Sequence, residues 1–466
     1  MNKFVKTIVA AASVLCLAAS CTGCDFALSA YDIAVKNGQF TGTEEQWIAS
    51  LQGQKGDDGK DLDIYEIYET ALEKGAIAEG TTFGDFLKEY FSQSSFTGVE
   101  NNDTKTIAEN LTSTVTVISK FTAGSGAYAE TYFGAGSGVI LELDKSAGNA
   151  MVVTNYHVVY DSEAGNVKTG SLAQQIYLGL YGDLVTFDKQ YQMTGEGILA
   201  ECVGGSPDHD VAVLKISNSS VLKNSEIATA ATLGNSNDVV VGEKVFAIGN
   251  AEGEGISVTS GVISVDSEYI TMTSTVNASA TTDYRVMRTD AAINHGNSGG
   301  GLFNARGQLI GITNAKSVSE DVDNMGYALP ISQVKAVVDN VLENGSFKSA
   351  KLGITVQTVN SSAVWNDANT ALKIVEEIKV TEVGKTMNGL LAVAGKDLKA
   401  GDVLVSARLG DGEEIALTRR FYLIDLLLQV RKGDTLYLKV KRSTFMGSTT
   451  EPPIEIKFDK DGYFVG

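Results

Sequence analysis

A serine set among glycines constrains this chain more than any other feature. Residues 294–301 read Asn-His-Gly-Asn-Ser-Gly-Gly-Gly, with the serine at position 298. Glycine lets backbone N–H groups crowd towards an incoming carbonyl group. A serine hydroxyl is a weak nucleophile by itself, so the segment predicts chemistry only if a base folds against it. The 466 residues contain only three histidines, His157, His209 and His295, so few bases are available.

The order of these residues along the chain separates the folds that could carry them. Residues 296–300 also match the Gly-x-Ser-x-Gly pattern of α/β-hydrolases, in which the histidine follows the serine. No histidine follows Ser298, so the sequence excludes that fold. Histidine, then an aspartate near 210, then serine is the order of chymotrypsin-like enzymes. The subtilisin-like order requires alternating strands and helices, and residues 111–316 lack that pattern.

His157 and Asp210 are the best candidates for the base and for the carboxylate that orients it. His157 follows the apolar run 150–153 and a short polar turn, and Asp210 directly precedes the apolar run 211–216. A buried aspartate holds the imidazole in the correct tautomer and stabilises the imidazolium that forms. We therefore predict a triad of His157, Asp210 and Ser298.

Three neighbouring residues are weaker candidates. Asp208 is the rival carboxylate, but its position is typical of a solvated turn. His209 and His295 are interpreted as residues that flank the catalytic positions. His295 lies beside the serine loop and can affect its rigidity, and we assign it no catalytic role.

The rest of residues 111–316 is rich in short apolar runs. They are separated by clusters of Gly, Asn, Asp and Ser, which is typical of β-barrels and sandwiches. The runs are 114–118, 137–141, 211–216, 245–248 and 308–312.

The chain resembles the HtrA-type (DegP-like) serine proteases, a branch of the trypsin-like superfamily. Four separated stretches carry the resemblance, in the family's order, and together they span roughly residues 111–345. They are 136–140 with 154–159, 210–215, 242–250 with 257–264, and 289–300 with 324–331. Two departures are His295 and Gly301, which stand where the family usually has proline.

The resemblance implies a fold class and a mechanism. The expected fold is mainly β, with a chymotrypsin-like double β-barrel protease domain over 108–345. Ser298 would attack the scissile carbonyl while His157 takes its proton. The backbone N–H groups of Gly296 and Ser298 would form the oxyanion hole. Ala292 stands six residues before the nucleophile, where trypsin-like enzymes line the primary specificity pocket, so we expect small or aliphatic side chains to be accepted.

Residues 350–460 resemble an α+β PDZ-like domain, the usual C-terminal companion of these proteases. The resemblance implies that Leu352, Gly353 and Ile354 form the loop whose amides hold a peptide carboxylate. A peptide would then add as a strand beside the apolar segment 419–430. Residues 357–390 are divergent, and a small α+β domain that only packs on the protease is the alternative.

The first residues predict export. Lys3 and Lys6 precede an apolar run over 7–19, which is too short for an ordinary membrane span. The run ends Leu-Ala-Ala-Ser-Cys at position 21, which resembles the lipobox of bacterial lipoproteins. We expect a signal peptide over 1–20, lipidation of Cys21 and an extracytoplasmic protein anchored to the bacterial cell membrane. Lipidation of Cys24, or a secreted protein cleaved nearby, is the alternative.

A faint internal repeat precedes the protease segment. Residues 31–38 mirror 68–75, and each unit is typical of a helix, a glycine stop and a capped second helix. We predict a helical repeat module with a glycine-rich linker over 21–92 and a flexible joint over 93–107. A spacer, an oligomerisation element and a wall-binding module remain open as its role.

Charge and motifs exclude some partners. The formal net charge of −20 argues against nucleic acid. The glycines of 134–138 precede a strand rather than a helix, which disfavours a phosphate loop. We expect no cofactor and no metal. The expected partners are unfolded or damaged proteins, peptide C-termini and the membrane, and the resemblance also implies a homotrimer.

The sequence thus favours an ATP-independent serine endopeptidase of the bacterial cell envelope that cleaves misfolded or damaged proteins. The alternative is a PDZ-containing scaffold or holdase with minor or latent proteolysis.

Overall fold

The computed structural model describes residues 103–465, except 125–128, 166–169, 184, 188–192, 196, 278, 315–324, 367, 385, 388–389, 392–396 and 446. The described residues all belong to one compact unit, Asn101–Gly466. The predicted signal peptide, Cys21, the helical repeat and residues 93–102 of the predicted joint lie outside them. Residues 103–107 belong to helix α6 (Asp103–Leu111) and not to a flexible joint. Among the described helices, none combines the length and the apolar composition that crossing a bilayer requires.

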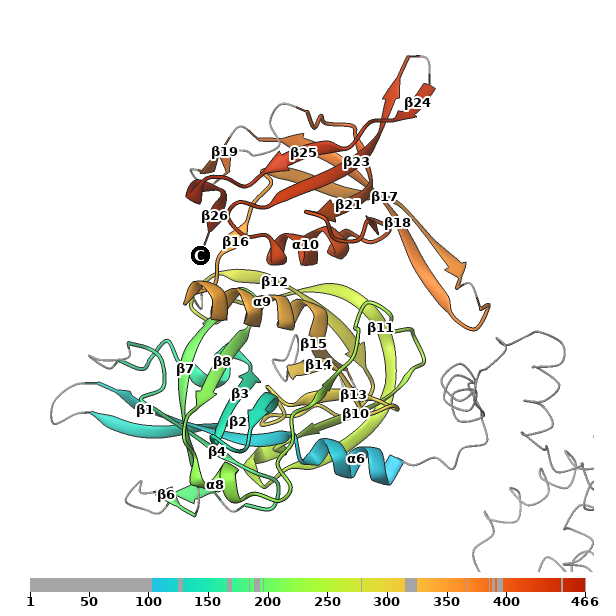
Figure 1. Ribbon diagram of the computed structural model, residues 1–466. Helices are drawn as coiled ribbons and strands as arrows, with labels where there is room; N and C mark the ends of the chain where they lie inside the picture. Colours follow the sequence, from blue (N-terminus) through green and yellow to red (C-terminus); the bar gives the residue numbers. More distant parts are fainter. Residues whose placement is uncertain are drawn as a thin grey trace, which may run out of the picture. The chain divides into compact units, whose positions relative to one another are not determined.

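Six antiparallel strands close into a first barrel in the order β1-β2-β3-β8-β7-β4 (Figure 1). Its interior is tightly packed around Val117, Leu178 and Leu214, which are fully buried. A methyl group added at Gly138 would lie 2.8 Å from Val152 Cγ1, so the interior leaves no room for a side chain there. The strands are β1 (Thr114–Ala123), β2 (Glu130–Asp144), β3 (Asn149–Thr154), β4 (Gln175–Gly179), β7 (Ile198–Ser206) and β8 (Val211–Ile216).

A second barrel follows in the chain. Its strand order is β13-β10-β11-β12-β15-β14, and the pairing of β13 with β14 closes the six strands into a ring. Strand β9 joins the outside of β14 in parallel. The strands are β9 (Thr232–Leu233), β10 (Lys244–Gly249), β11 (Ser257–Thr273), β12 (Thr281–Thr289), β13 (Gly301–Asn304), β14 (Gln308–Asn314) and β15 (Gly326–Pro330).

The predicted double β-barrel is confirmed. Each of the five apolar runs expected from the sequence lies in a strand, namely β1, β2, β8, β10 or β14. Burial along β8, β10 and β14 is nearly continuous, which fits short apolar strands that are packed on both faces.

Helix α9 (Ile331–Asn344) covers the two barrels. It follows β15 directly and packs its apolar side on β7, β8 and β14 through Val334, Val337 and Val341. Gly345 ends the helix with a left-handed φ of 70°, and its N–H donates to the Val341 carbonyl oxygen at 2.9 Å. Glycine adopts this conformation without the steric cost that a Cβ brings.

A third sheet has its own core. Its strand order is β17-β18-β21-β23-β24, and the buried residues behind it include Ile378, Leu404, Leu438 and Phe458. The strands are β17 (Ile354–Trp365), β18 (Leu372–Val383), β21 (Val403–Leu409), β22 (Ile415–Ala416), β23 (Thr435–Thr444), β24 (Gly447–Thr450) and β25 (Ile454–Lys457).

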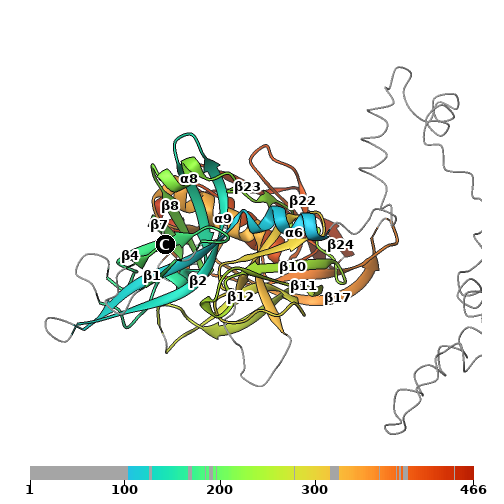
Figure 2. The same cartoon turned by 90° about the horizontal axis from the view of Figure 1, so that it is seen from below.

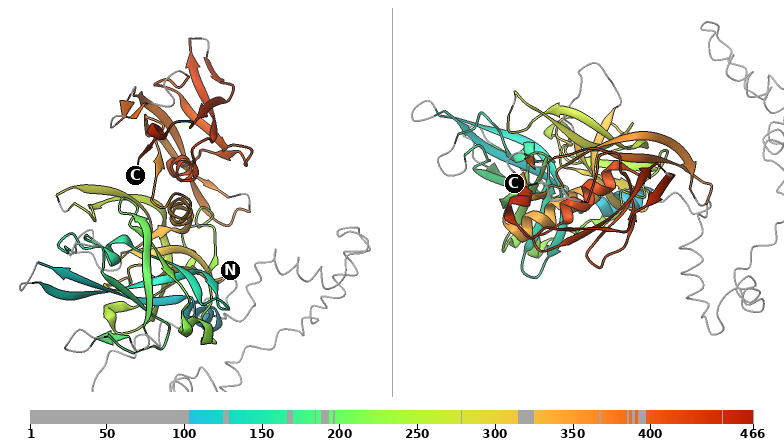
Figure 3. Two further views of the ribbon diagram at one scale, coloured as in Figure 1. Left: turned by 60° about the vertical axis from the view of Figure 1, so that its left-hand side comes forward. Right: turned by 90° about the horizontal axis from the view of Figure 1, so that it is seen from above.

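Helix α10 (Arg420–Gln429) lies between this sheet and the barrels. It packs against α9, and the left view of Figure 3 shows the two helices end-on and side by side. The pair β16 (Ser349–Ala350) and β26 (Phe464–Val465) joins the chain after α9 to the C-terminal residues.

The remaining elements are short. Helix α6 packs on β10 (Figure 2). Asp103 in this helix forms an ion pair with Lys244. These elements are α6 (Asp103–Leu111), α7 (Tyr156–Val159), α8 (Ser220–Asn224), η3 (Ala251–Gly253), β5 (Thr186–Phe187), β6 (Met193–Thr194), β19 (Thr386–Met387), β20 (Leu390–Leu391) and η4 (Asp461–Tyr463).

Candidate active site

His157 and Asp210 are in direct contact. His157 lies in the single turn of α7, just after β3, and Asp210 ends the turn between β7 and β8. The imidazole Nδ1 lies 2.7 Å from Asp210 Oδ2, and the backbone N–H of His157 donates to Asp210 Oδ1 at 3.0 Å. Because an ionised carboxylate only accepts, Nδ1 carries the proton in this contact. The unprotonated Nε2 is then the nitrogen that can take a proton from a nucleophile.

Two asparagines hold Asp210 in place, and the sequence reasoning missed both. Asn314 Nδ2 donates to Asp210 Oδ2 at 2.9 Å, and Asn155 Nδ2 donates to the Asp210 carbonyl oxygen at 3.0 Å. Asp210 is fully buried, and a buried carboxylate requires charge-assisted hydrogen bonds, such as the one from Asn314, to remain ionised. Its backbone has a φ of 51°, a left-handed conformation in which aspartate is more frequent than most residues.

The Ser298 loop is pinned to both barrels. From the first barrel, the N–H of Ser137 donates to the Ser298 carbonyl oxygen at 2.8 Å. From the second barrel, Thr313 Oγ1 donates to the Asn297 carbonyl oxygen at 2.6 Å. Gly299 has a φ of 87°, and a methyl group added there would lie 2.1 Å from the Ser137 carbonyl oxygen. Only glycine fits at this position.

Gly136 in β2 lies between the serine loop and the turn that carries His157. A methyl group added at Gly136 would lie 2.7 Å from Val158 Cγ1 and 3.2 Å from the Ser298 carbonyl oxygen. Gly136 therefore lies between Val158, which follows His157 in the chain, and the backbone of Ser298. The Ser298 side chain is largely buried, with 6% of its surface exposed. The Ser298 backbone thus lies near the turn that carries His157, where the two barrels join.

Gly296 is placed to offer a free amide. Its φ is 88°, and its carbonyl oxygen accepts a hydrogen bond from Ser137 Oγ at 2.7 Å. Among the described residues, its N–H donates to no protein acceptor. A preorganised amide of this kind can stabilise a developing oxyanion.

The other predicted positions lie at the edge of this site or outside it. Ala292 is exposed beyond β12, and its carbonyl oxygen accepts a hydrogen bond from Thr259 Oγ1 at 2.8 Å. His295 and Asp208 are exposed. His209 is half-buried and does not join the triad, because its Nδ1 lies 2.8 Å from Ser206 Oγ instead.

A groove of about 300 Å³ lies between the start of β17 and α10. It contains the three residues predicted to hold a peptide carboxylate, Leu352, Gly353 and Ile354. In the described part of the chain, the N–H groups of Leu352 and Gly353 donate to no protein acceptor. The lining residues are His209, Ser349, Ala350, Lys351, Leu352, Gly353, Ile354, Val356, Ile378, Arg420, Leu423, Ile424, Leu427 and Leu428.

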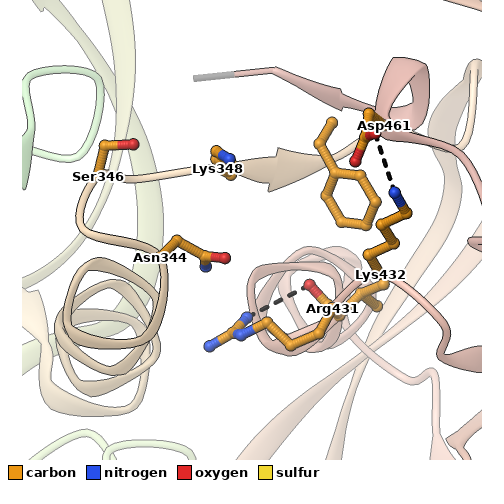
Figure 4. Close-up of a pocket in the computed structure, with 8 residues that line it drawn as sticks. Asn344, Ser346, Lys348, Arg431, Lys432 and Asp461 are labelled. Atoms are coloured by element: carbon orange, nitrogen blue, oxygen red, sulfur yellow. Dashed lines mark hydrogen bonds and ion pairs between the residues drawn. The ribbon is translucent and has the colours of Figure 1, made fainter.

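A second hollow, of about 480 Å³, is lined by polar and charged residues near the end of α9 (Figure 4). Two of its three cations, Arg431 and Lys432, are already engaged. Lys432 Nζ lies 2.9 Å from Asp461 Oδ2, and Arg431 donates to the Leu428 carbonyl oxygen at 2.9 Å and pairs with Glu343. The hollow contains none of the three residues predicted to hold a peptide carboxylate.

Known proteins share this sequence pattern. Residues 136–312 match the family model of the trypsin-like peptidase domain. The chain is similar to the serine protease Do-like HtrA of Lactococcus lactis subsp. lactis, at 34% identity over 283 residues, 59% of this chain and 60% of that protein. It is similar to the serine protease Do-like HtrA of Lactobacillus helveticus, at 30% identity over 322 residues, 67% of each chain.

A third relative is the periplasmic serine endoprotease DegP of Escherichia coli, at 33% identity over 283 residues. That match covers 60% of this chain and 50% of DegP. The chain thus spans about half to two thirds of the length of these relatives.

Proposed function

The chain belongs to the HtrA-type trypsin-like serine proteases, and from this premise we propose that it is an ATP-independent serine endopeptidase of the bacterial cell envelope. The observation that carries the proposal is the contact between His157 and the buried Asp210 at the junction where the Ser298 loop is pinned. A buried carboxylate behind a histidine that sits beside a glycine-bounded serine is suited to acyl transfer.

The proposed mechanism uses these groups in turn. Ser298 Oγ attacks the scissile carbonyl carbon while His157 Nε2 accepts the hydroxyl proton. The N–H groups of Gly296 and Ser298 stabilise the oxyanion, and His157 then returns the proton to the leaving amine. Water attacks the resulting ester by the same route and regenerates the free serine. Asp210 keeps the imidazole oriented throughout and stabilises its positive charge.

The proposed substrates are misfolded or damaged proteins. With alanine at position 292, the primary specificity pocket has no acidic group at that point, which supports cleavage after small or aliphatic residues. Mass spectrometry of the fragments from an unfolded substrate tests this preference. Abundant cleavage after lysine or arginine would contradict it.

Casein digestion by the wild type and by Ser298→Ala tests the proposed activity. We expect the variant to lose turnover by a factor on the order of a million. Circular dichroism of both proteins controls for folding. Equal digestion by both proteins would show that the nucleophile is assigned wrongly. Digestion by neither protein would favour the scaffold or holdase function.

For the C-terminal part, we propose a PDZ-like domain over 350–460 that binds peptide C-termini, next to a protease domain over 108–345. The separate core behind β18, β21 and β23 supports this division. The free amides of Leu352 and Gly353 and the apolar side of α10 support binding of a carboxylate and an aliphatic side chain. The peptide would add as a strand along β17.

For the N-terminal part, we propose cleavage of a signal peptide after residue 20 and lipidation of Cys21, which would anchor the protein outside the cytoplasm. Incorporation of labelled palmitate into the wild type and its loss in Cys21→Ala is the test. Label retained in Cys21→Ala and lost in Cys24→Ala would show that Cys24, and not Cys21, is lipidated.

A homotrimer is proposed on family resemblance, and light scattering of the purified protein tests it.

A further inference from the structure

We propose that His209 is a ligand-binding residue of the groove beside α10, where its Nε2–H donates a hydrogen bond to the carboxylate of a bound peptide. This inference rests on the proposed peptide binding and extends it. It assigns one of the groove's recognition groups to the first barrel, whereas the chain after α9 supplies the rest of the groove.

His209 lies on the wall of the groove although it belongs to the first barrel. It stands in the turn between β7 and β8, directly before Asp210. It lines the groove together with Lys351, Leu352 and Gly353 from the chain after α9. The imidazole also packs edge-on against Phe347, with ring centroids 5.0 Å apart, and this contact restricts its rotation.

The hydrogen bond to Ser206 sets which edge of the imidazole faces the groove. Ser206 does not line the groove, and its hydroxyl lies 2.8 Å from His209 Nδ1. The opposite edge of the ring, which includes Nε2, is therefore the part that can reach the groove. In the described part of the chain, Nε2 has no hydrogen-bond partner.

The same bond sets the tautomer. Ser206 is buried, and among the described residues its hydroxyl has no acceptor other than His209 Nδ1. Buried hydroxyls normally donate a hydrogen bond, so Nδ1 is the acceptor. Burial, together with the nearby Lys351, lowers the pKa of His209 to about 4, so the ring is neutral at pH 7. A neutral ring that accepts at Nδ1 carries its proton on Nε2.

The groups around Nε2 favour an anion. Lys351 forms no ion pair with any described residue, and the amides of Leu352 and Gly353 are also unused. Arg420 adds a further cation on the groove wall. Its guanidinium lies 4.1 Å from the Tyr269 ring centroid. Beside them, Leu423, Leu427 and Ile378 are apolar. A carboxylate attached to an aliphatic side chain, as at a peptide C-terminus, matches both parts.

Fluorescence anisotropy on the full chain carrying Ser298→Ala, which prevents digestion, tests the inference. The probe is a labelled alanine-rich peptide of about ten residues that ends in leucine, either as the free carboxylate or as the amide. We expect the carboxylate form to bind more tightly. His209→Phe keeps the packing on Phe347 but removes the donor, so it should weaken the carboxylate form about 10-fold and leave the amide form unchanged.

Matched variants complete the design. His209→Gln retains a donor and should recover part of the affinity, which also covers the case that His209→Phe fails to fold. Lys351→Gln should weaken binding, whereas Lys348→Gln, an exposed lysine at the hollow of Figure 4, should not. Leu423→Asp in the groove wall should abolish binding of both peptide forms.

Each failure has a distinct meaning. If both peptide forms bind His209→Phe and the parent equally, the role of His209 is overturned and the groove proposal stands. If the parent binds neither form, or if Leu423→Asp leaves binding intact, the groove proposal fails and the inference fails with it.

Discussion

Asp210 and His209 are neighbours in the chain, but they serve two differently built sites. Asp210 faces the junction of the barrels, where its contacts to His157, Asn155 and Asn314 come from the two barrels alone. His209 faces the groove, most of which is supplied by the chain after α9. The first site depends on the barrels closing correctly. The second also depends on the third sheet docking against them.

That docking is held by a buried ionic cluster. Arg285 in β12 pairs with Asp425 in α10, and both side chains are buried. The Arg285 guanidinium lies 3.6 Å from the Phe421 ring centroid and donates to Ser267 Oγ at 3.1 Å. Burial raises the pKa of Asp425, while Arg285 opposes that rise. The groove should therefore be far more sensitive than the triad to changes in this cluster.

The largest expected effect comes from replacing Asp210, at the site where the two barrels join. Asp210→Asn preserves the shape of the side chain but removes the charge that fixes the His157 tautomer. We expect kcat on casein-derived peptides to fall about 10,000-fold. Peptide binding in the groove should be unchanged, because Asp210 does not line it. A variant that kept more than a tenth of the wild-type kcat would contradict the assigned role of Asp210.

The next effect comes from breaking the docking cluster. Asp425→Ala leaves the Arg285 charge buried without its partner, which should lower the free energy of unfolding by about 3–5 kcal/mol. Urea denaturation measures this loss. Replacing both residues, Arg285→Met with Asp425→Leu, should cost much less, because no unpaired charge remains. If the double variant were as unstable as the single one, packing rather than charge would be what the pair contributes.

The two sites also differ in how far the sequence could predict them. His157 and Asp210 stand at the ends of apolar strand runs, and the chain contains few histidines, so residue order and strand pattern were sufficient to predict their contact. Asn155 and Asn314 carry no such signal, because their role exists only once β3, β8 and β14 converge on Asp210. His209 was interpreted as a flanking residue, since nothing in its local sequence indicates that the third sheet docks beside it.

The divergent segment 357–390 has a physical explanation. Strands β17 and β18 form a long two-stranded ribbon in which Trp365 pairs with Leu372. Nearly all of β17 beyond Thr358 is exposed, so neither face requires apolar residues at alternate positions. The alternation that predicts a half-buried strand is therefore absent from this part of the sequence.

A smaller effect on kcat is expected from replacing Asn314, which donates to Asp210. Asn314→Ala removes one donor from Asp210 Oδ2 but leaves the contact with His157. Loss of a hydrogen bond to a charged group predicts a fall in kcat of about 10-fold, with KM nearly unchanged, because Asn314 acts on substrate only through Asp210. Asn304→Ala, at a buried asparagine that bonds to Gln308, is the matched control and should retain kcat. A change in KM alone would show that Asn314 contacts substrate.

An effect that develops only over a limited pH range concerns His209 and the free energy of unfolding. An unfolded histidine has a pKa near 6.5, whereas burial holds the pKa of His209 at about 4 in the folded protein. Between these two values the unfolded chain binds more protons, so this residue lowers stability as the pH falls from about 6.5 to 4. The loss should total about 1–3 kcal/mol. His209→Phe should therefore show a shallower decline over this range in urea denaturation, while His295→Phe, which removes an exposed histidine, should follow the wild type. Parallel curves for His209→Phe and the wild type would mean that the imidazole takes up its proton in the folded protein and that the bond from Ser206 does not hold it neutral.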